Sequence, residues 1–173
     1  ASGTRYEGNY INGYRTGEGK ILYEDGGTYE GEFFEGLEEG NGHIKWANGD
    51  EYHGEWKDGN RDGKGEYIYL DGNKYNGNWV NNFENGFGVF EWSDGEKYEG
   101  EWEDGVRTGF GKYYYASGTI YEGAFFENSL EGDGILNYAS GDKYVGQFKD
   151  DAEHGLGKME YINGDIYEGQ FDE

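Results

Sequence analysis

Aromatic, glycine and polar residues recur along this chain with a period of 23 residues. The clearest marker is a tyrosine that returns in every period and is followed two residues later by glycine: Tyr6, Tyr29, Tyr52, Tyr75, Tyr98, Tyr121, Tyr144 and Tyr167. We number this tyrosine as repeat position 0 and count the other positions from it. A fixed period predicts a repeat architecture, in which one supersecondary unit is copied along the chain.

Two further repeat positions are also aromatic. Position 4 carries Tyr10, Phe33, Trp56, Trp79, Trp102, Phe125, Phe148 and Phe171. Position 17 carries Tyr23, Trp46, Tyr69, Trp92, Tyr115, Tyr138 and Tyr161. Glycine returns at positions 2, 11, 13 and 20. A glycine held at one phase of a repeat indicates a backbone requirement, either a positive φ or a close approach of another group.

Each repeat has the residue pattern of a β-hairpin. The run Tyr-x-Gly-x-aromatic alternates with a period of two residues, and a second such run follows, as in Lys64 to Tyr69. A six-residue polar loop such as Asp58 to Gly63 is expected between the two strands. The connection to the next repeat carries a strong hairpin-turn signal, as in Asp71-Gly72.

The length of the connection between repeats decides which side chains share a face of the sheet. A two-residue turn would place the rings at position 17 opposite to the next tyrosine, so that neither face would be apolar. A three-residue loop with glycine in the left-handed conformation places positions 15 and 17 on the same face as the next tyrosine. We expect the three-residue loop, which gives one aromatic face and one polar face.

The predicted fold class is all-β, an elongated single-layer twisted antiparallel sheet of tandem β-hairpins with the character of a solenoid. A single hairpin is only marginally stable, so neighbouring hairpins must bury each other's rings. The domain prediction is one array over residues 1–173, with about seven full repeats and a partial eighth that starts at residue 167. Aliphatic residues are scarce, but 18 tyrosines and 5 tryptophans supply large apolar area in their place.

Charge and cysteine content narrow the class of partner and the compartment. The chain has 37 acidic and 14 basic residues and a net charge of -23, which repels nucleic acid and favours basic partners. It has no cysteine and no long apolar stretch, so we expect a cytoplasmic protein, associated with the cytoskeleton or with membranes only through partners.

The consensus of the repeats, seen in Tyr98-Glu99-Gly100-Glu101-Trp102 and the residues up to Gly118, resembles the MORN repeat (membrane occupation and recognition nexus). The resemblance implies antiparallel sheets that bind partners, dimerise or lie near membranes. The family usually has histidine before the glycine at position 11, whereas here only His154 keeps it. Basic residues at the adjacent position are reduced to Arg15, Arg61 and Arg107, so direct phosphoinositide or membrane binding is disfavoured.

The favoured function is a non-catalytic protein-interaction scaffold with an aromatic groove, since Trp and Tyr are enriched at binding hot spots. The residues predicted to contact a partner are Tyr52, Trp56, Tyr69, Tyr75, Trp79, Trp92, Tyr98, Trp102 and Tyr115. The expected partner is a protein or peptide with basic flanks, and a homodimer or end-to-end association is a second expectation. The alternative function is a regulatory or localising MORN domain of a larger enzyme, of the lipid kinase or lysine methyltransferase type.

Candidate chemistry in the sequence is weak. His43 and His53 are expected to lie directly across from each other on the polar face, where two imidazoles can share a metal ion. No third ligand is evident, so the sequence favours a surface pair over a metal site. No carboxylate pair stands out for acid-base catalysis, so neither enzyme activity nor a cofactor is expected.

Overall fold

The computed structural model describes residues 3–172, and over this range the regular elements are all β-strands. The first strands of the hairpins have seven residues, or six in the last: β1 Arg5–Ile11, β3 Thr28–Phe34, β5 Glu51–Lys57, β7 Lys74–Val80, β9 Lys97–Glu103, β11 Ile120–Phe126, β13 Lys143–Lys149 and β15 Ile166–Phe171. The second strands have nine residues: β2 Tyr14–Leu22, β4 Leu37–Lys45, β6 Asn60–Ile68, β8 Phe83–Glu91, β10 Val106–Tyr114, β12 Ser129–Asn137 and β14 Ala152–Glu160. The strand order of the sheet is the chain order, which confirms the predicted all-β fold of tandem antiparallel hairpins. Within the described range, no helix could cross a membrane.

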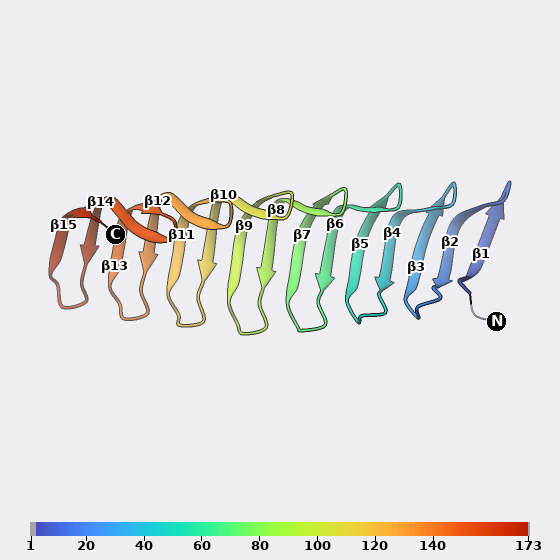
Figure 1. Cartoon of the computed structure of the whole chain (residues 1–173), viewed down its shortest axis with the longest axis horizontal. Helices are drawn as coiled ribbons and strands as arrows, with labels where there is room; N and C mark the ends of the chain where they lie inside the picture. The colour runs from blue at the N-terminus through green and yellow to red at the C-terminus, as the bar shows by residue number, and fades with distance from the viewer. Residues whose placement is uncertain (1–2, 173) are drawn as a thin grey trace. The chain divides into compact units, whose positions relative to one another are not determined.

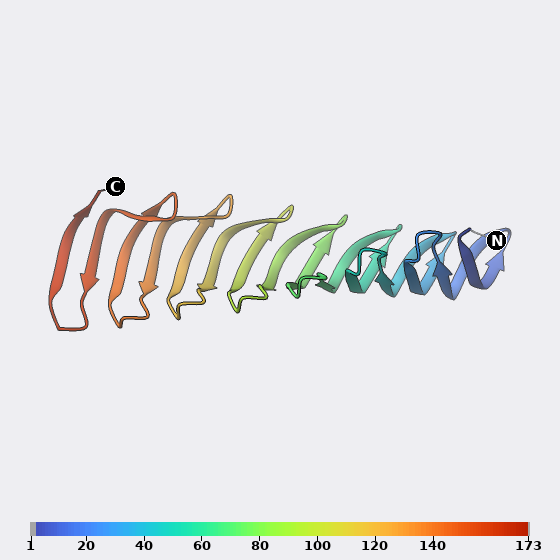
Figure 2. The same cartoon turned by 60° about the horizontal axis from the view of Figure 1, so that its bottom comes forward.

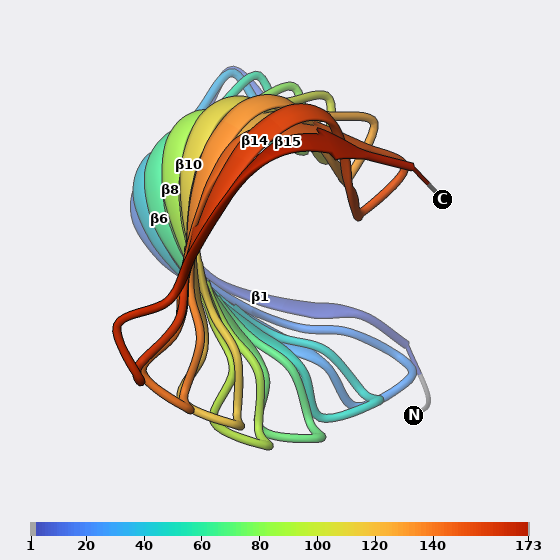
Figure 3. The same ribbon diagram turned by 90° about the vertical axis from the view of Figure 1, so that its left-hand side faces the viewer.

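The chain divides into two compact units, Ala1–Asn85 and Gly86–Glu173. In each unit the hairpins follow one another in chain order (Figure 1). The turns within hairpins lie at one edge of each unit, and the connections between hairpins lie at the other edge (Figure 2). The strands of each unit are curved rather than flat (Figure 3), so each unit has a concave and a convex face.

The connection between hairpins is the predicted three-residue loop. Ile21 lies opposite Tyr29 in the β2–β3 ladder, and the Tyr23 amide donates to the Gly27 carbonyl at 2.9 Å. Gly26, the last residue of the loop, has a φ of 97°, in the left-handed region that favours glycine. The same pairing recurs in both units, for example with Tyr113 opposite Tyr121. The predicted register, with positions 15 and 0 on one face, is therefore confirmed.

The turn within each hairpin is shorter than the sequence analysis expected. The six-residue loop from Asp58 to Gly63 is wrong, because Lys57 pairs with Asn60 and only Asp58 and Gly59 lie between the strands. Both turn residues have positive φ, 49° and 77°, as a type I′ hairpin turn requires. Gly63 instead forms a bulge in β6, with a φ of 109°, which bends the strand.

The tyrosine at position 0 lies over a pair of bare glycines. Tyr52 extends across Gly54 and Gly65, which are partners in the β5–β6 ladder, and its hydroxyl donates to the Glu55 carbonyl at 3.0 Å. A side chain at either glycine would occupy the space of this ring. Six tyrosines in this position have no exposed surface at all: Tyr29, Tyr52, Tyr75, Tyr98, Tyr121 and Tyr144. Since residues 3–172 form no second layer over the sheet, we infer that curvature of the strands encloses these rings.

Edge-to-face ring contacts connect each hairpin to the next. Tyr52 packs against Trp56 of its own hairpin at 5.3 Å and against Trp79 of the following hairpin at 5.4 Å, both nearly perpendicular. In the second unit, Tyr98 makes the same two contacts with Trp102 and Phe125. Such pairs are favourable beyond the area they bury. The collective packing expected from the sequence is therefore present in both units.

The hydroxyl of a buried tyrosine contributes to stability through one main-chain hydrogen bond. The Tyr98 hydroxyl donates to the Glu101 carbonyl at 3.0 Å and has no access to water. We expect Tyr98→Phe to lower the free energy of unfolding by about 1 kcal/mol, measured by urea denaturation. The control is Tyr167→Phe, whose hydroxyl bonds to the Gln170 carbonyl at 2.9 Å in a side chain that is 45% exposed. Equal losses in the two variants would contradict the burial argument.

Candidate functional site

The nine rings predicted to contact a partner fall into two groups in the structure. Six of them lie at positions 0 and 4, and all six are buried: Tyr52, Trp56, Tyr75, Trp79, Tyr98 and Trp102. The tryptophans of this group also donate to main-chain carbonyls of the preceding hairpin, as Trp79 Nε1 does to Gly65 at 3.2 Å. These rings connect neighbouring hairpins, and the three tyrosines among them have no exposed surface for a partner to contact.

The other three predicted rings, Tyr69, Trp92 and Tyr115, occupy position 17 and are half-buried. Trp46 occupies the same position in the second repeat and is also half-buried, although the sequence analysis did not include it among the contact residues. Its ring stacks on Tyr67 with centroids 5.2 Å apart and planes 28° from parallel. Trp46 could have been predicted from the sequence, because it occupies the same repeat position as the three predicted rings.

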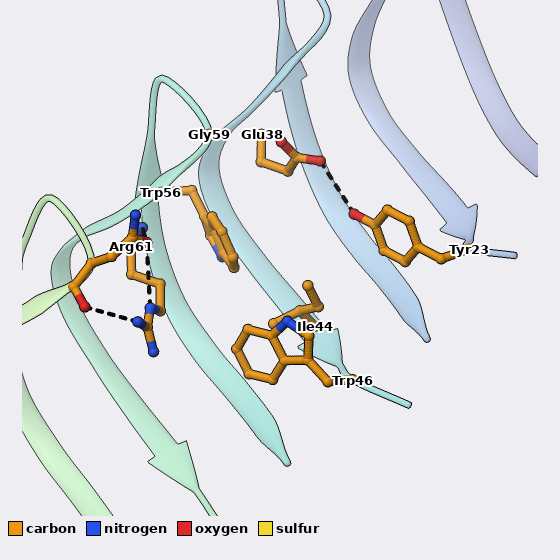
Figure 4. Close-up of a pocket in the computed structure, with 8 residues that line it drawn as sticks. Tyr23, Glu38, Ile44, Trp46, Trp56, Gly59 and Arg61 are labelled. Carbon is orange, nitrogen blue, oxygen red and sulfur yellow. Dashed lines mark hydrogen bonds between the residues drawn. The ribbon is translucent and has the colours of Figure 1, made fainter. Parts of the chain in front are cut away.

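A hollow in the first unit is built around Trp46 (Figure 4). It encloses about 270 Å³ and is lined by residues from three successive repeats and one from a fourth: Tyr23, Glu38, Ile44, Trp46, Trp56, Gly59, Arg61 and Asn82. Trp46 and Arg61 lie on one side of the hollow and Tyr23 and Glu38 on the other (Figure 4). An aromatic wall with a few convergent polar groups is the usual composition of a ligand-binding hollow.

Arg61 is held in place by rings and by the next hairpin. Its guanidinium carbon lies 4.3 Å from the ring centre of Trp79 and 5.9 Å from that of Trp46. Its Nη2 donates to the Asn82 carbonyl at 2.8 Å, and its amide donates to Asn82 Oδ1 at 2.9 Å. Burial lowers the pKa of the guanidinium from its ordinary value. The Arg61 guanidinium therefore binds groups of this chain, and the faces of the surrounding rings partly offset the cost of burying its positive charge.

Tyr23 and Glu38 form the acidic side of the same hollow. The Tyr23 hydroxyl donates to Glu38 Oε1 at 3.4 Å (Figure 4). Burial, followed by the nearby Glu38 charge, raises the pKa of the Tyr23 phenol to about 12. Glu38 and Arg61 occupy the same repeat position in successive repeats, so the hollow is lined by both a carboxylate and a cation.

The second unit repeats the arginine arrangement with different neighbours. Arg107 lies over Tyr113 at 5.3 Å and over Trp92 at 5.7 Å, and its Nη2 donates to the Asn128 carbonyl at 2.9 Å. Tyr113 in turn donates to Glu96. Trp92 and Tyr115, both predicted as contact residues, therefore lie at the margin of a cluster built like the one around Arg61.

The two histidines occupy the polar face as predicted. His43 of β4 lies directly opposite His53 of β5. Their rings stack, with centroids 3.8 Å apart and planes 12° from parallel. Glu51, which the sequence analysis did not consider, lies two residues before His53 on the same face, and its carboxylate approaches both rings. A search for polar residues at a spacing of two from His53 would have found it.

The fold and these contacts define a repeat protein of tandem β-hairpins that presents a row of half-buried rings in each unit. The chain belongs to the MORN repeat family, whose profile matches seven consecutive stretches: residues 6–28, 29–51, 52–74, 75–97, 98–120, 121–143 and 144–166. β15 begins at Ile166 and continues the pattern beyond the last matched stretch. No curated protein matches the chain.

The fold is similar to that of a solved domain in complex with a peptide motif. The SAS-4 (dCPAP) TCP domain of Drosophila melanogaster, in complex with a proline-rich motif of Ana2 (dSTIL), superposes with a TM-score of 0.57 at 14% sequence identity, covering 97% of this chain and 90% of that one. The TCP10 domain of Danio rerio CPAP, in complex with a peptide of STIL, gives a TM-score of 0.40 at 13% identity, covering 96% of this chain and 83% of that one. At these identities the likeness to the Drosophila domain concerns the fold alone.

Proposed function

We propose that this chain is a non-catalytic protein-interaction scaffold whose aromatic face binds an extended segment of a partner. The observation that carries the proposal is the hollow in the first unit, where the half-buried Trp46 lies beside Arg61 and faces Tyr23 and Glu38. The buried rings at positions 0 and 4 of the inner repeats hold the hairpins together, so the half-buried rings at position 17 remain for a partner.

The chemistry of the hollow fits an extended peptide better than a small molecule. Flat aromatic walls bind proline-rich segments, whose extended conformation loses little entropy on binding. The fold likeness to a TCP domain that is seen with a proline-rich motif supports this choice. The net charge of -23 favours basic residues on either side of the bound segment.

The arginines support a protein partner over an acidic membrane. Arg15 donates from Nη2 to the Gly36 carbonyl at 2.5 Å, and Arg61 and Arg107 make the equivalent bond to Asn82 and Asn128. Binding to acidic lipid needs clusters of basic residues free to reach the headgroups. Each of these three guanidinium groups instead lies over rings of the sheet.

Selection of a peptide and substitution of Trp46 test the proposal. A phage-displayed library of proline-containing peptides with basic flanks is selected on the purified chain, and the affinity of the selected peptide is measured by fluorescence anisotropy. We expect Trp46→Ala to weaken binding by at least about tenfold, the loss of one hot-spot ring. The control is Leu70→Ala, a side chain that is 73% exposed in a connecting loop, which should leave the affinity unchanged.

Two results would oppose the proposal. One is a selection that yields no peptide with a measurable affinity. The other is a selected peptide that binds Trp46→Ala as well as it binds the unsubstituted chain, with the variant shown to be folded by circular dichroism. An affinity that falls with added salt is expected if basic flanks contribute.

A further inference from the structure

The polar face of the first unit brings together three side chains whose donor atoms can bind one metal ion. His43, Glu51 and His53 each offer one atom, and all three atoms lie within 4.8 Å of one another. The Nε2 atom of His43 is 3.2 Å from Glu51 Oε2, and the Nε2 atom of His53 is 3.6 Å from the same oxygen. We propose that His43, His53 and Glu51 form a binding site for a divalent transition-metal ion such as Zn²⁺.

The separations agree with the coordination geometry of zinc. Ligand atoms at the usual Zn–N and Zn–O distances of about 2 Å in a tetrahedral site lie about 3.3 Å from one another. The two nitrogen–oxygen distances of 3.2 and 3.6 Å are close to that value before any ion is bound. Both imidazole rings must rotate out of their stacked arrangement to direct all three donors at one ion. Neutral imidazole nitrogens and a carboxylate are ligands that Zn²⁺ commonly takes.

The β-sheet fixes these donors without help from a loop. His43 and His53 are a directly opposed pair in the β4–β5 ladder, and Glu51 pairs with Lys45 one step further along the same face. All three side chains are partly exposed, between 26% and 46%, so an ion can reach them from solvent. Three protein ligands leave a fourth position for water, as in open zinc sites.

The surrounding charges favour a cation. Glu30 lies opposite His43 and Glu66 lies opposite His53 in the neighbouring ladders. Lys45 Nζ bonds to Glu51 Oε1 at 2.5 Å, which leaves Oε2 facing the imidazoles. Lys45 also opposes a bound cation, and its removal should strengthen binding.

The repeats themselves supply a control that keeps the fold. The positions of His43 and His53 are occupied by Lys20 and Glu30 in the repeat before, and by Lys112 and Glu122 in the second unit, where they form ion pairs. The double variant His43→Lys, His53→Glu therefore replaces the imidazoles with a pair that this sheet already accommodates. Because His154 belongs to another hairpin, His154→Gln tests for binding elsewhere.

The experiment is a calorimetric titration of the chelator-treated protein with ZnCl₂. We expect one Zn²⁺ per chain, an affinity lowered at least about tenfold in His43→Lys, His53→Glu, and no change in His154→Gln. We expect Lys45→Gln to bind about fivefold more tightly, because one nearby positive charge is removed at the surface. The histidine signals of His43 and His53 in NMR spectra should shift with the ion.

Other results would overturn the proposal. Circular dichroism first establishes that the double variant is folded. Binding of equal strength in that variant would assign the ion to surface carboxylates. The absence of stoichiometric binding to the unsubstituted chain, or equal losses in the double variant and His154→Gln, would be equally decisive against it.

Discussion

Raising the pH above about 10 will unfold this protein in a steep transition, because its core tyrosines cannot ionise while they are buried. Burial raises the pKa of most core phenols, and the pKa of Tyr69, like that of Tyr23, is raised to about 12. For Tyr29, Tyr52, Tyr75, Tyr98 and Tyr121 burial is again the largest cause of a raised pKa. These five side chains have no exposed surface.

The sign of the effect follows from proton binding. Below the unfolded pKa of about 10 both states keep the phenol proton, so the stability is unaffected. Above it, the unfolded chain releases protons that the folded chain retains, and the folded state loses about 1.4 kcal/mol per tyrosine and pH unit. Five fully buried tyrosines together lose about 7 kcal/mol per pH unit, which is comparable with the whole stability of a typical domain.

Circular dichroism and the ultraviolet absorbance of tyrosinate, recorded together between about pH 9 and pH 12, check this prediction. Ionisation of the buried tyrosines should coincide with loss of the β-sheet signal, and lowering the pH should restore the phenols and the sheet together. Gradual ionisation of all tyrosines with the sheet intact would show that the rings are not enclosed as described.

Replacement of Gly54 by alanine should lower the free energy of unfolding by about 3 kcal/mol, the upper part of the range for overpacked cores. A Cβ atom at Gly54 would lie 2.5 Å from the Tyr52 hydroxyl oxygen and 2.5 Å from the Gly65 Cα. The Gly65 Cα and the Lys64 carbonyl oxygen, at 2.6 Å, are main chain, so relief requires the adjacent strand to shift as well as displacement of a ring that packs against Trp56 and Trp79. Urea denaturation followed by circular dichroism measures the loss.

The turn of the same hairpin supplies the matched substitution. Gly59 has a φ of 77°, and a Cβ atom there would meet nothing closer than Glu38 Oε2 at 3.5 Å. Gly59→Ala should therefore cost only the backbone strain of the left-handed conformation, about 1 kcal/mol. A Gly54→Ala variant no less stable than Gly59→Ala would mean that the tyrosine ring can move aside freely.

The sequence was sufficient to predict the sheet and the register between successive hairpins. The 23-residue period of the tyrosines predicted the hairpins. The requirement that Ile21, Tyr23 and Tyr29 share one face predicted the three-residue connection that the structure contains. The sequence analysis placed the turn at Asp58-Gly59 in a longer loop, because it interpreted Gly63 as part of that loop. A bulge and a loop glycine look alike in a sequence, since both require positive φ.

The candidate site was less predictable, because burial on a one-layer sheet depends on its curvature. The 23-residue period and the alternation of side chains along each strand place Trp46, Tyr52 and Trp56 on a common face. They do not show which of the three side chains is the most exposed. Only the curved strands enclose Tyr52 and Trp56 while Trp46 stays half-buried at the margin. The same holds for Glu51, whose approach to two imidazoles depends on the rotamers of three side chains and not on the register alone.

The arginine contacts of the first unit recur in every second hairpin, so their period is twice the 23-residue repeat. Arg15 and Arg61 each donate a hydrogen bond to a carbonyl in the turn of the following hairpin. Glu38 occupies the same position in the hairpin between them, and its carboxylate has no proton to donate. The main-chain bond to the following turn is present in all three hairpins, and the arginine side chain adds a second bond in the first and the third. Removal of two adjacent hairpins from this unit would keep arginine and glutamate alternating at this repeat position, whereas removal of the second hairpin alone would place Arg15 and Arg61 in successive repeats.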